Sequence, residues 1–179
     1  LQVASKHGLN INWSKCRFLQ RKIEYLGFII ENGTVQPSEH KTEAVAKFKV
    51  PRCVKDVQSF LGLTGYFRKF IPRYAMIARP LTNLLRAGTV FSFGEKEREA
   101  FERLKIMLIN KPILKIYCPK LETELHTDAS QFGYGIILLQ KDPVDNKFHP
   151  VFYASMKTTP AEEKRTSYEL EVLAIVKAL

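Results

Sequence analysis

The stretch VKDVQSFLGLTGYFRKFI, residues 54–71, predicts an amphipathic helix that Pro72 ends. Its apolar residues recur at steps of three and four, which places them on one stripe of the helix. The opposite face carries polar, small and aromatic residues, namely Gln58, Gly62, Tyr66 and Lys69. A glycine inside a helix costs about 1 kcal/mol relative to alanine, so Gly62 and Gly65 need a physical reason. Either a second helix crosses closely here or a nucleic-acid backbone approaches the helix.

Shorter elements are expected on both sides of this helix. Upstream, residues 16–18 and 23–30 predict the two strands of a hairpin, and the dipeptide Asn32-Gly33 predicts a second turn. A helix is expected after Ser38. Downstream, two further helices are expected over residues 80–86 and 95–108.

Beyond Pro119 the hydrophobic pattern changes to the period of a strand. Residues 121–127, 133–140 and 148–154 predict an antiparallel meander of three strands. The segment 159–162 has the pattern of a capping box, and a longer helix is expected from near Ser167 to the end. The predicted fold class is therefore α+β, with a β-hairpin and a helical region followed by a truncated βββα unit.

The composition indicates a globular protein. Hydrophobic residues make up 45% and charged residues 26% of the 179 residues, which excludes a disordered tail. The longest apolar run, residues 136–139, is far shorter than the roughly 20 residues that span a bilayer, so no membrane partner is expected. The spacing of the three cysteines suits neither a disulfide framework nor a metal site, so reduced intracellular thiols are expected.

The charge of the chain is unevenly distributed. Residues 1–119 carry 21 Lys and Arg against 9 Asp and Glu, whereas residues 120–179 carry 7 against 9. Such a basic block suits a polyanion, because each cation that meets a phosphate releases condensed counterions. The alternative is a basic surface that serves solubility alone.

Two carboxylates occupy positions that are unusual for charged residues. Asp128 ends the first strand of the βββα unit, and Glu171 stands between apolar residues near the start of the last helix. Carboxylates brought together repel each other unless a cation lies between them, and Mg²⁺ favours oxygen ligands. The alternative is that Asp128 caps a turn and that Glu171 interacts with the helix dipole.

Several motifs in one order identify a family resemblance. TDAS (127–130), GYG (133–135), YAS (153–155), TPAE (159–162) and EVLAIV (171–176) resemble the ribonuclease H domain of gypsy-type LTR retrotransposon Pol polyproteins. YLGFI (25–29) and VQSFLGLTGYFRKFIP (57–72) resemble the reverse transcriptase segment just upstream. The resemblance covers nearly the whole chain.

The resemblance implies three regions. Residues 1–36 are expected to be the end of the reverse transcriptase palm with its primer-grip hairpin, residues 37–118 a helical thumb and connection, and residues 119–179 the start of a ribonuclease H domain. The chain opens at Leu1 and closes at Leu179 inside a predicted helix, so we expect a fragment of a longer protein.

The resemblance also implies which residues meet nucleic acid. The primer grip would hold the 3′ end of the primer, and the long helix would lie in the minor groove of the template–primer duplex. The expected nucleic-acid-binding residues are Tyr25, Leu26, Gly27, Gln58, Gly62, Tyr66 and Lys69. Recognition would depend on shape and 2′-hydroxyl groups, because the duplex is an A-like hybrid.

Asp128 and Glu171 match the first two catalytic carboxylates of the ribonuclease H set. In the family these residues and further aspartates hold two Mg²⁺ ions, which makes both residues expected metal ligands. The further aspartates and the paired polymerase aspartates have no counterpart in this chain, so we predict that it is inactive alone.

The expected function is a fragment of an RNA-directed DNA polymerase with ribonuclease H, whose partners are an RNA–DNA hybrid, the template–primer duplex and the rest of Pol. The expected location is the cytoplasm, in a virus-like particle, or the nucleus. One alternative is a non-catalytic nucleic-acid-binding module from a decayed or host-adopted element. Another is a protein-interaction module on a ribonuclease H-like fold, which predicts no affinity for duplexes.

Overall fold

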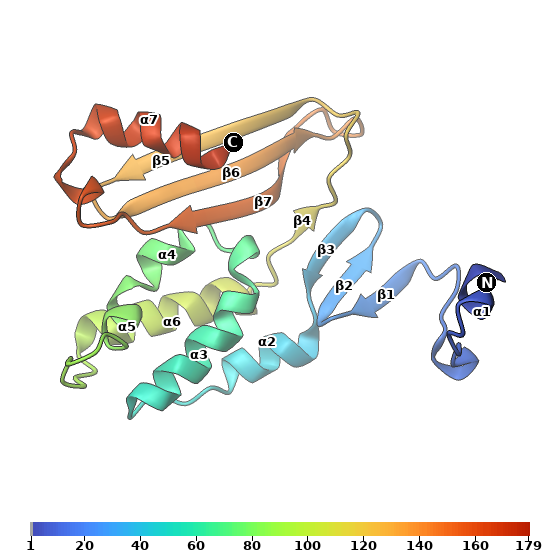
Figure 1. Cartoon of the computed structure of the whole chain (residues 1–179), viewed down its shortest axis with the longest axis horizontal. Helices are drawn as coiled ribbons and strands as arrows, with labels where there is room; N and C mark the ends of the chain where they lie inside the picture. The colour runs from blue at the N-terminus through green and yellow to red at the C-terminus, as the bar shows by residue number, and fades with distance from the viewer. Residues whose placement is uncertain (1) are drawn as a thin grey trace.

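The computed structural model describes residues 2–179, apart from the side chain of Ser5. An antiparallel sheet contains, in order, β1 (Lys22–Tyr25), β2 (Phe28–Glu31), β3 (Thr34–Pro37) and β4 (Leu114–Lys115). The helical region contains α2 (Glu39–Ala46), α3 (Val54–Tyr66), η2 (Arg68–Phe70), α4 (Tyr74–Ile77), α5 (Arg79–Asn83) and α6 (Glu95–Ile109). A short helix α1 (Gln2–Lys6) and the 3₁₀ turn η1 (Trp13–Lys15) lie apart from the rest at the N-terminus (Figure 1).

A second antiparallel sheet follows the helical region. Its strands are β5 (Thr123–Ser130), β6 (Gly133–Lys141) and β7 (Phe148–Met156), and they are followed by η3 (Glu162–Lys164) and α7 (Ser167–Ala178). This β5–β7 sheet lies between two layers, with α7 against one face and the helical region against the other (Figure 1). The predicted α+β class, including the βββα unit, is confirmed.

The first hairpin differs from the prediction. Residues 16–18 form no strand, and the stretch read as one strand over residues 23–30 folds back on itself at Leu26 and Gly27. Both residues have positive φ, 50° and 77°, which is the geometry of a two-residue hairpin turn. A leucine rarely adopts positive φ, so local preference favoured a continuous strand. The predicted turn at Asn32-Gly33 is confirmed, with φ of 48° and 71°.

The helical elements differ from the prediction mainly at their ends. The long helix stops at Tyr66, and the chain continues as the 3₁₀ turn η2 instead of remaining helical to Ile71. The helix expected over 80–86 corresponds to α5, which ends earlier, at Asn83, and the short helix α4 before it was not predicted. Strand β4, which was not predicted, pairs with β3 and closes the first sheet.

Aromatic side chains fill the main core between the helices. Phe60 on α3 lies 4.5 Å from Phe101 on α6, measured between ring centroids, and both are fully buried. Phe28 on β2 packs against this core from the hairpin, and Tyr153 on β7 packs against it from the second sheet. One core therefore joins the two sheets to the helical region.

Side chains of the β5–β7 sheet alternate between its two covered faces. Ala129, Tyr134 and Met156 pack with Leu170 and Ala174 of α7. Their neighbours point the other way: the Ser155 hydroxyl accepts a hydrogen bond from the backbone N–H of Ala75 at 2.8 Å. Because the side chains of a strand alternate, Asp128, opposite Gly135 in the register, shares the face of Ser155.

An ion pair attaches α7 to η3, beside the β5–β7 sheet. The Lys177 ammonium lies 2.7 Å from the Glu162 carboxylate and 4.7 Å from the centroid of the buried Tyr134 ring. The side-chain hydrogen bond from Lys177 and the backbone N–H of Thr159 lower the pKa of Glu162 from 4.5 to about 2. The ionised carboxylate therefore stabilises the packing of α7.

We predict that this ion pair makes folding stability depend on pH below 5. Because the folded pKa of Glu162 is depressed, its contribution is complete above 4.5 and is lost as the pH falls towards about 2. Urea unfolding of the wild type should therefore show a steeper fall in the free energy of unfolding over this range than unfolding of Glu162→Gln. Lys177→Met, which removes the ammonium but leaves the hydrogen bond from Thr159, should flatten the profile in part. Parallel profiles for all three proteins would contradict the prediction.

Candidate functional site

The hairpin turn presents the first group of predicted nucleic-acid-binding residues. Tyr25 and Leu26 have relative exposures of 61% and 65%, so both side chains are available to a ligand. The Gly27 carbonyl accepts a hydrogen bond from the backbone N–H of Ser38 at 2.9 Å, which holds the turn against the start of α2. The turn is therefore exposed but fixed in position.

The outer face of α3 presents the second group. Gln58, Gly62 and Tyr66 are exposed and follow one another at four-residue steps, on the side opposite the buried residues Val57, Phe60 and Thr64. A four-residue step on a helix keeps side chains on one face. The structure thus places these three residues together along one exposed ridge.

The two glycines of α3 have different surroundings. A Cβ atom built on Gly62 would meet no atom within 4 Å, so no other helix crosses here. A Cβ on Gly65 would lie 3.5 Å from the Tyr74 hydroxyl oxygen, which is ordinary packing inside the protein. A close contact within the fold therefore accounts for Gly65 and does not account for Gly62.

Tyr66 joins the hairpin to α3. Its hydroxyl donates a 2.6 Å hydrogen bond to the Leu26 carbonyl, and its ring stacks on Phe28 with centroids 5.2 Å apart. The Lys69 ammonium lies 4.2 Å from the centroid of the same Phe28 ring, and burial lowers the pKa of Lys69. A cation over an aromatic face is attracted by the ring quadrupole. These contacts hold the two groups of predicted residues in one rigid surface.

A cavity of about 530 Å³ lies where the hairpin and α3 meet. Its lining includes Leu26, Gly27, Gly62 and Tyr66, all of them predicted site residues, together with Lys41 of α2. Lys41 was missed because its helix carries no motif, yet its side chain crosses the turn: a Cβ on Gly27 would lie 3.2 Å from the Lys41 Cε atom. The cavity therefore has free space beside Gly62 and a cation, Lys41, in its lining.

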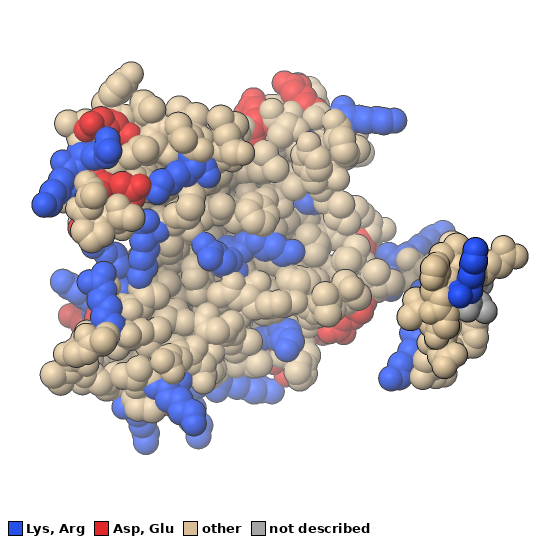
Figure 2. Space-filling model, viewed as in Figure 1, with Lys and Arg blue, Asp and Glu red and all other residues tan. Residues whose placement is uncertain are grey.

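Positive charge is spread over the face seen in Figure 2. Lys and Arg side chains are distributed over the helical region there, while Asp and Glu side chains are more prominent near the second sheet. This arrangement follows the sequence, in which residues 1–119 hold the basic excess. A phosphate backbone that approached the helical region would meet mostly cations.

Asp128 lies near the end of β5, on the face that the helical region covers. Its carboxylate forms an ion pair with the guanidinium of Arg73, which precedes α4. The side chain of Asp128 is 49% exposed, beside a cavity of about 310 Å³ that Arg73 and His126 also line. The contact that the structure shows for this carboxylate is thus an ion pair between layers.

Glu171 lies on α7 and is half-buried, on the other side of the sheet from the Arg73 contact. The ligating atoms of Asp128 and Glu171 belong to no group of three or more metal-binding side chains among the described residues. Asp128 is neutralised by a guanidinium rather than left free for a cation. In this arrangement the two residues do not fit a two-metal centre, and their role as metal ligands stays a prediction.

One group of possible ligands lies elsewhere, in the turn between β6 and β7. The ligating atoms of Asp142, Asp145 and His149 lie within 4.8 Å of one another. The Lys115 ammonium lies 2.6 Å from Asp142, and both aspartates accept backbone hydrogen bonds within the turn. These contacts explain the cluster as turn structure.

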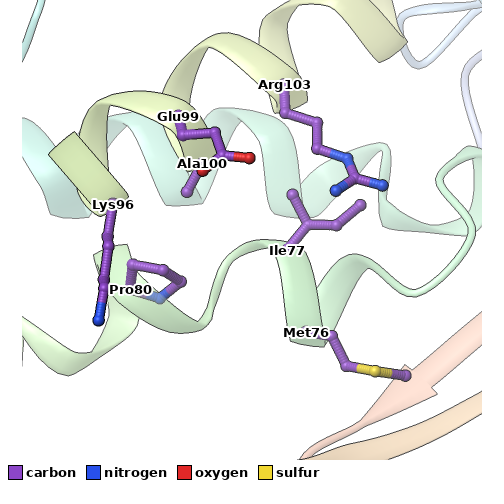
Figure 3. A pocket seen from close by; sticks show the side chains of 7 residues that line it. All are labelled: Met76, Ile77, Pro80, Lys96, Glu99, Ala100 and Arg103. Carbon is purple, nitrogen blue, oxygen red and sulfur yellow. The ribbon is translucent and has the colours of Figure 1, made fainter.

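A smaller cavity, of about 200 Å³, lies between α4, α5 and α6 (Figure 3). Lys96, Glu99 and Arg103 line it from α6, and Met76 and Ile77 line it from α4. It contains none of the predicted site residues.

None of the helices in the described part of the chain combines the length and hydrophobicity needed to cross a bilayer.

Comparisons with known proteins show what the chain is similar to. Residues 93–179 match the family described as the RNase H-like domain found in reverse transcriptase. The Retrovirus-related Pol polyprotein from transposon 297 of Drosophila melanogaster is 37% identical over 169 residues, which are 94% of this chain and 15% of that protein. The Transposon Tf2-3 polyprotein of Schizosaccharomyces pombe is 33% identical over all 179 residues, which are 13% of its length.

Solved structures show the same fold. The foamy viral protease-reverse transcriptase in complex with RNA/DNA hybrid superimposes with a TM-score of 0.77, over 92% of this chain and 22% of that chain, at 24% identity. The same viral protein in complex with double-stranded DNA superimposes with a TM-score of 0.75 at 23% identity. The chain thus spans a small part of each relative. It belongs to the Pol polyproteins of retrotransposons, in the region that includes the RNase H-like domain of reverse transcriptase.

Proposed function

We propose that this segment of Pol holds a template–primer duplex between the Leu26-Gly27 turn and the outer face of α3. The observation that carries the proposal is the Tyr66 contact, which fixes both elements around one cavity. Gly62 leaves the ridge open, so a sugar-phosphate backbone has room to approach the helix axis. Lys41 and Lys69 border the same surface and supply cations for the phosphates.

The surface suits recognition of shape rather than sequence. It consists of a helix ridge, a hairpin turn and cations, which can follow a minor groove and its phosphates. Solved structures with the same fold were determined with an RNA/DNA hybrid and with double-stranded DNA, which supports a duplex ligand for this chain. A basic surface that served solubility alone would not require the hydrogen bond from Tyr66 to Leu26 that connects the helix to the hairpin.

We further propose the division of the chain that its motifs imply: residues 1–36 as palm end and primer grip, residues 37–118 as thumb and connection, and residues 119–179 as the start of ribonuclease H. In the complete Pol polyprotein, Asp128 and Glu171 would supply two of the carboxylates that hold divalent cations, namely Mg²⁺. A non-catalytic duplex-binding role is the second candidate, and the ion pair between Arg73 and Asp128 favours it for the arrangement seen here.

We predict that the chain binds an RNA–DNA hybrid with a strong salt dependence. Two phosphate contacts, by Lys41 and Lys69, should lower the affinity about tenfold between roughly 50 and 200 mM salt. Fluorescence anisotropy with a labelled hybrid measures this change. Lys41→Gln should reduce the logarithmic salt slope by about one, whereas Lys96→Gln, which alters the separate cavity between α4, α5 and α6, should leave it unchanged. Binding that ignores salt would contradict the proposed interface.

We predict that Gly62→Leu separates binding from stability. Leucine should raise the free energy of unfolding by up to about 1 kcal/mol, because it favours a helix and meets no atom within 4 Å of its Cβ. Its bulk on the ridge should lower hybrid affinity by about tenfold, or about 1.4 kcal/mol. Gly62→Ala is the matched control, since it improves helix propensity with little bulk. Equal affinities for the leucine and alanine variants would contradict the prediction.

We predict that the 179-residue chain does not cleave RNA in a hybrid, even with Mg²⁺. Two-metal hydrolysis needs carboxylates gathered around both ions, and the described arrangement keeps Asp128 paired with Arg73. Gel analysis of an end-labelled RNA strand in the hybrid tests this expectation. Cleavage that disappears in Asp128→Asn would show that the site assembles within this chain.

A further inference from the structure

Three cations come together where the helical region meets the second sheet. Arg79 belongs to α5, Arg86 follows that helix, and Lys157 comes directly after β7. Among the described residues, Glu163 is their one acidic partner, and it pairs with Arg79 at 3.2 Å. Figure 2 shows Lys and Arg side chains gathered along the left edge of the molecule, at the level where the two layers meet. We call Arg79, Arg86 and Lys157 the α5–β7 cluster.

The Lys157 ammonium is held on the side of α5 that carries both arginines. Arg79, Thr82 and Arg86 follow one another at steps of three and four residues, which keeps them on one side of the helical turns. Backbone hydrogen bonds continue these turns past the end of α5, as far as Arg86. Lys157 donates a hydrogen bond to the hydroxyl of Thr82, the middle position of the three.

Such a cluster is costly while no anion is bound. Like charges brought together repel each other, and burial disfavours the charged form of each group. Partial burial lowers the pKa of Lys157, and the positive charges of Arg86 and Arg79 lower it further. The Arg79 guanidinium is already occupied, because it pairs with Glu163 and lies 4.4 Å from the centroid of the Phe132 ring. Arg86 and Lys157 therefore remain the cations that an anion would neutralise.

We propose that the α5–β7 cluster is a second binding site for the phosphates of a nucleic-acid backbone. Arg86 and Lys157 would each contact a phosphodiester group, the guanidinium as a two-pronged donor and the ammonium as a point charge. Arg79 is a positioning residue that keeps α5 against the second sheet. The site lies apart from the hairpin, because α5 and the end of β7 are on the opposite side of the view in Figure 1.

The inference extends the proposed function and rests on it for the identity of the ligand. A duplex on α3 that also reached the α5–β7 cluster would run along the helical region towards the second sheet. Nucleic acid is favoured over an acidic protein segment, because the basic excess of residues 1–119 includes both sites. The second site would therefore lengthen the contact with one ligand.

The salt dependence of hybrid binding tests the second site. Two further phosphate contacts should increase the loss of affinity between roughly 50 and 200 mM salt from about tenfold to about a hundredfold. Fluorescence anisotropy with the 179-residue protein and a labelled hybrid measures this loss. Arg86→Gln and Lys157→Gln should each reduce the logarithmic salt slope by about one. Lys147→Gln, the same change just before β7 begins, is the matched control and should leave the slope unchanged.

Variants that keep the charge separate a phosphate contact from a structural role. Arg86→Lys and Lys157→Arg retain a cation and should retain most of the salt slope. Arg86→Gln should leave the melting temperature unchanged or raise it, because it removes a repelling charge. Should Lys157→Gln disturb the fold through the lost contact with Thr82, Arg86→Gln still tests the site.

The outcomes separate the second site from the surface at the hairpin. If Lys41→Gln reduces the salt slope and both cluster variants leave it unchanged, the second site is wrong and the hairpin surface stands. If the cluster variants reduce the slope and Lys41→Gln does not, the second site stands and the hairpin surface is wrong. An equal reduction in Lys147→Gln would show a diffuse positive field and overturn the second site. A chain that binds no hybrid at low salt contradicts both.

Discussion

The ring of Phe28 holds together the surface that we propose for nucleic-acid binding. It stacks on Tyr66, meets Phe67 edge-on at 5.5 Å and lies 5.8 Å from Phe70, all measured between ring centroids. Phe67 and Phe70 are buried in the main core, so Phe28 ties the hairpin to the most rigid part of the molecule. A turn on an isolated two-stranded hairpin would be only marginally stable. The exposed positions of Leu26 and Gly27 depend on this aromatic packing.

A second constraint is the set of polar contacts that Ser155 makes between the helical region and the β5–β7 sheet, here called the polar seam. Ser155 is almost fully buried and uses both its hydroxyl and its carbonyl in hydrogen bonds to the helical region. A buried polar group that lost such partners would be costly, so the seam determines how the layers meet. The same arrangement places Arg73 over Asp128. The surface proposed for duplex binding and the candidate catalytic carboxylate are therefore parts of one connected structure.

Much of the candidate site could be predicted from local patterns. The four-residue spacing of Gln58, Gly62 and Tyr66 is enough to place them on one helix face, because a helix repeats every 3.6 residues. The sequence left two explanations open for both glycines of the helix; the structure shows no close contact at Gly62, whereas Gly65 contacts Tyr74. Lys41 could not be predicted as a site residue, since nothing in its own segment indicates that its side chain crosses the hairpin turn.

The sequence by itself determined the α+β class, the order of the strands in the meander, and the helix faces, because these depend on hydrophobic period and turn residues close together in the chain. Only the tertiary structure decided the Leu26-Gly27 turn, the pairing of β3 with β4 and the partner of Asp128. The alternation of a strand determines that Asp128 and Ala129 point to opposite faces, but not which layer covers each face. That choice comes from contacts between residues 55 positions apart in the chain, such as Arg73 and Asp128, and local preference carries no information about it.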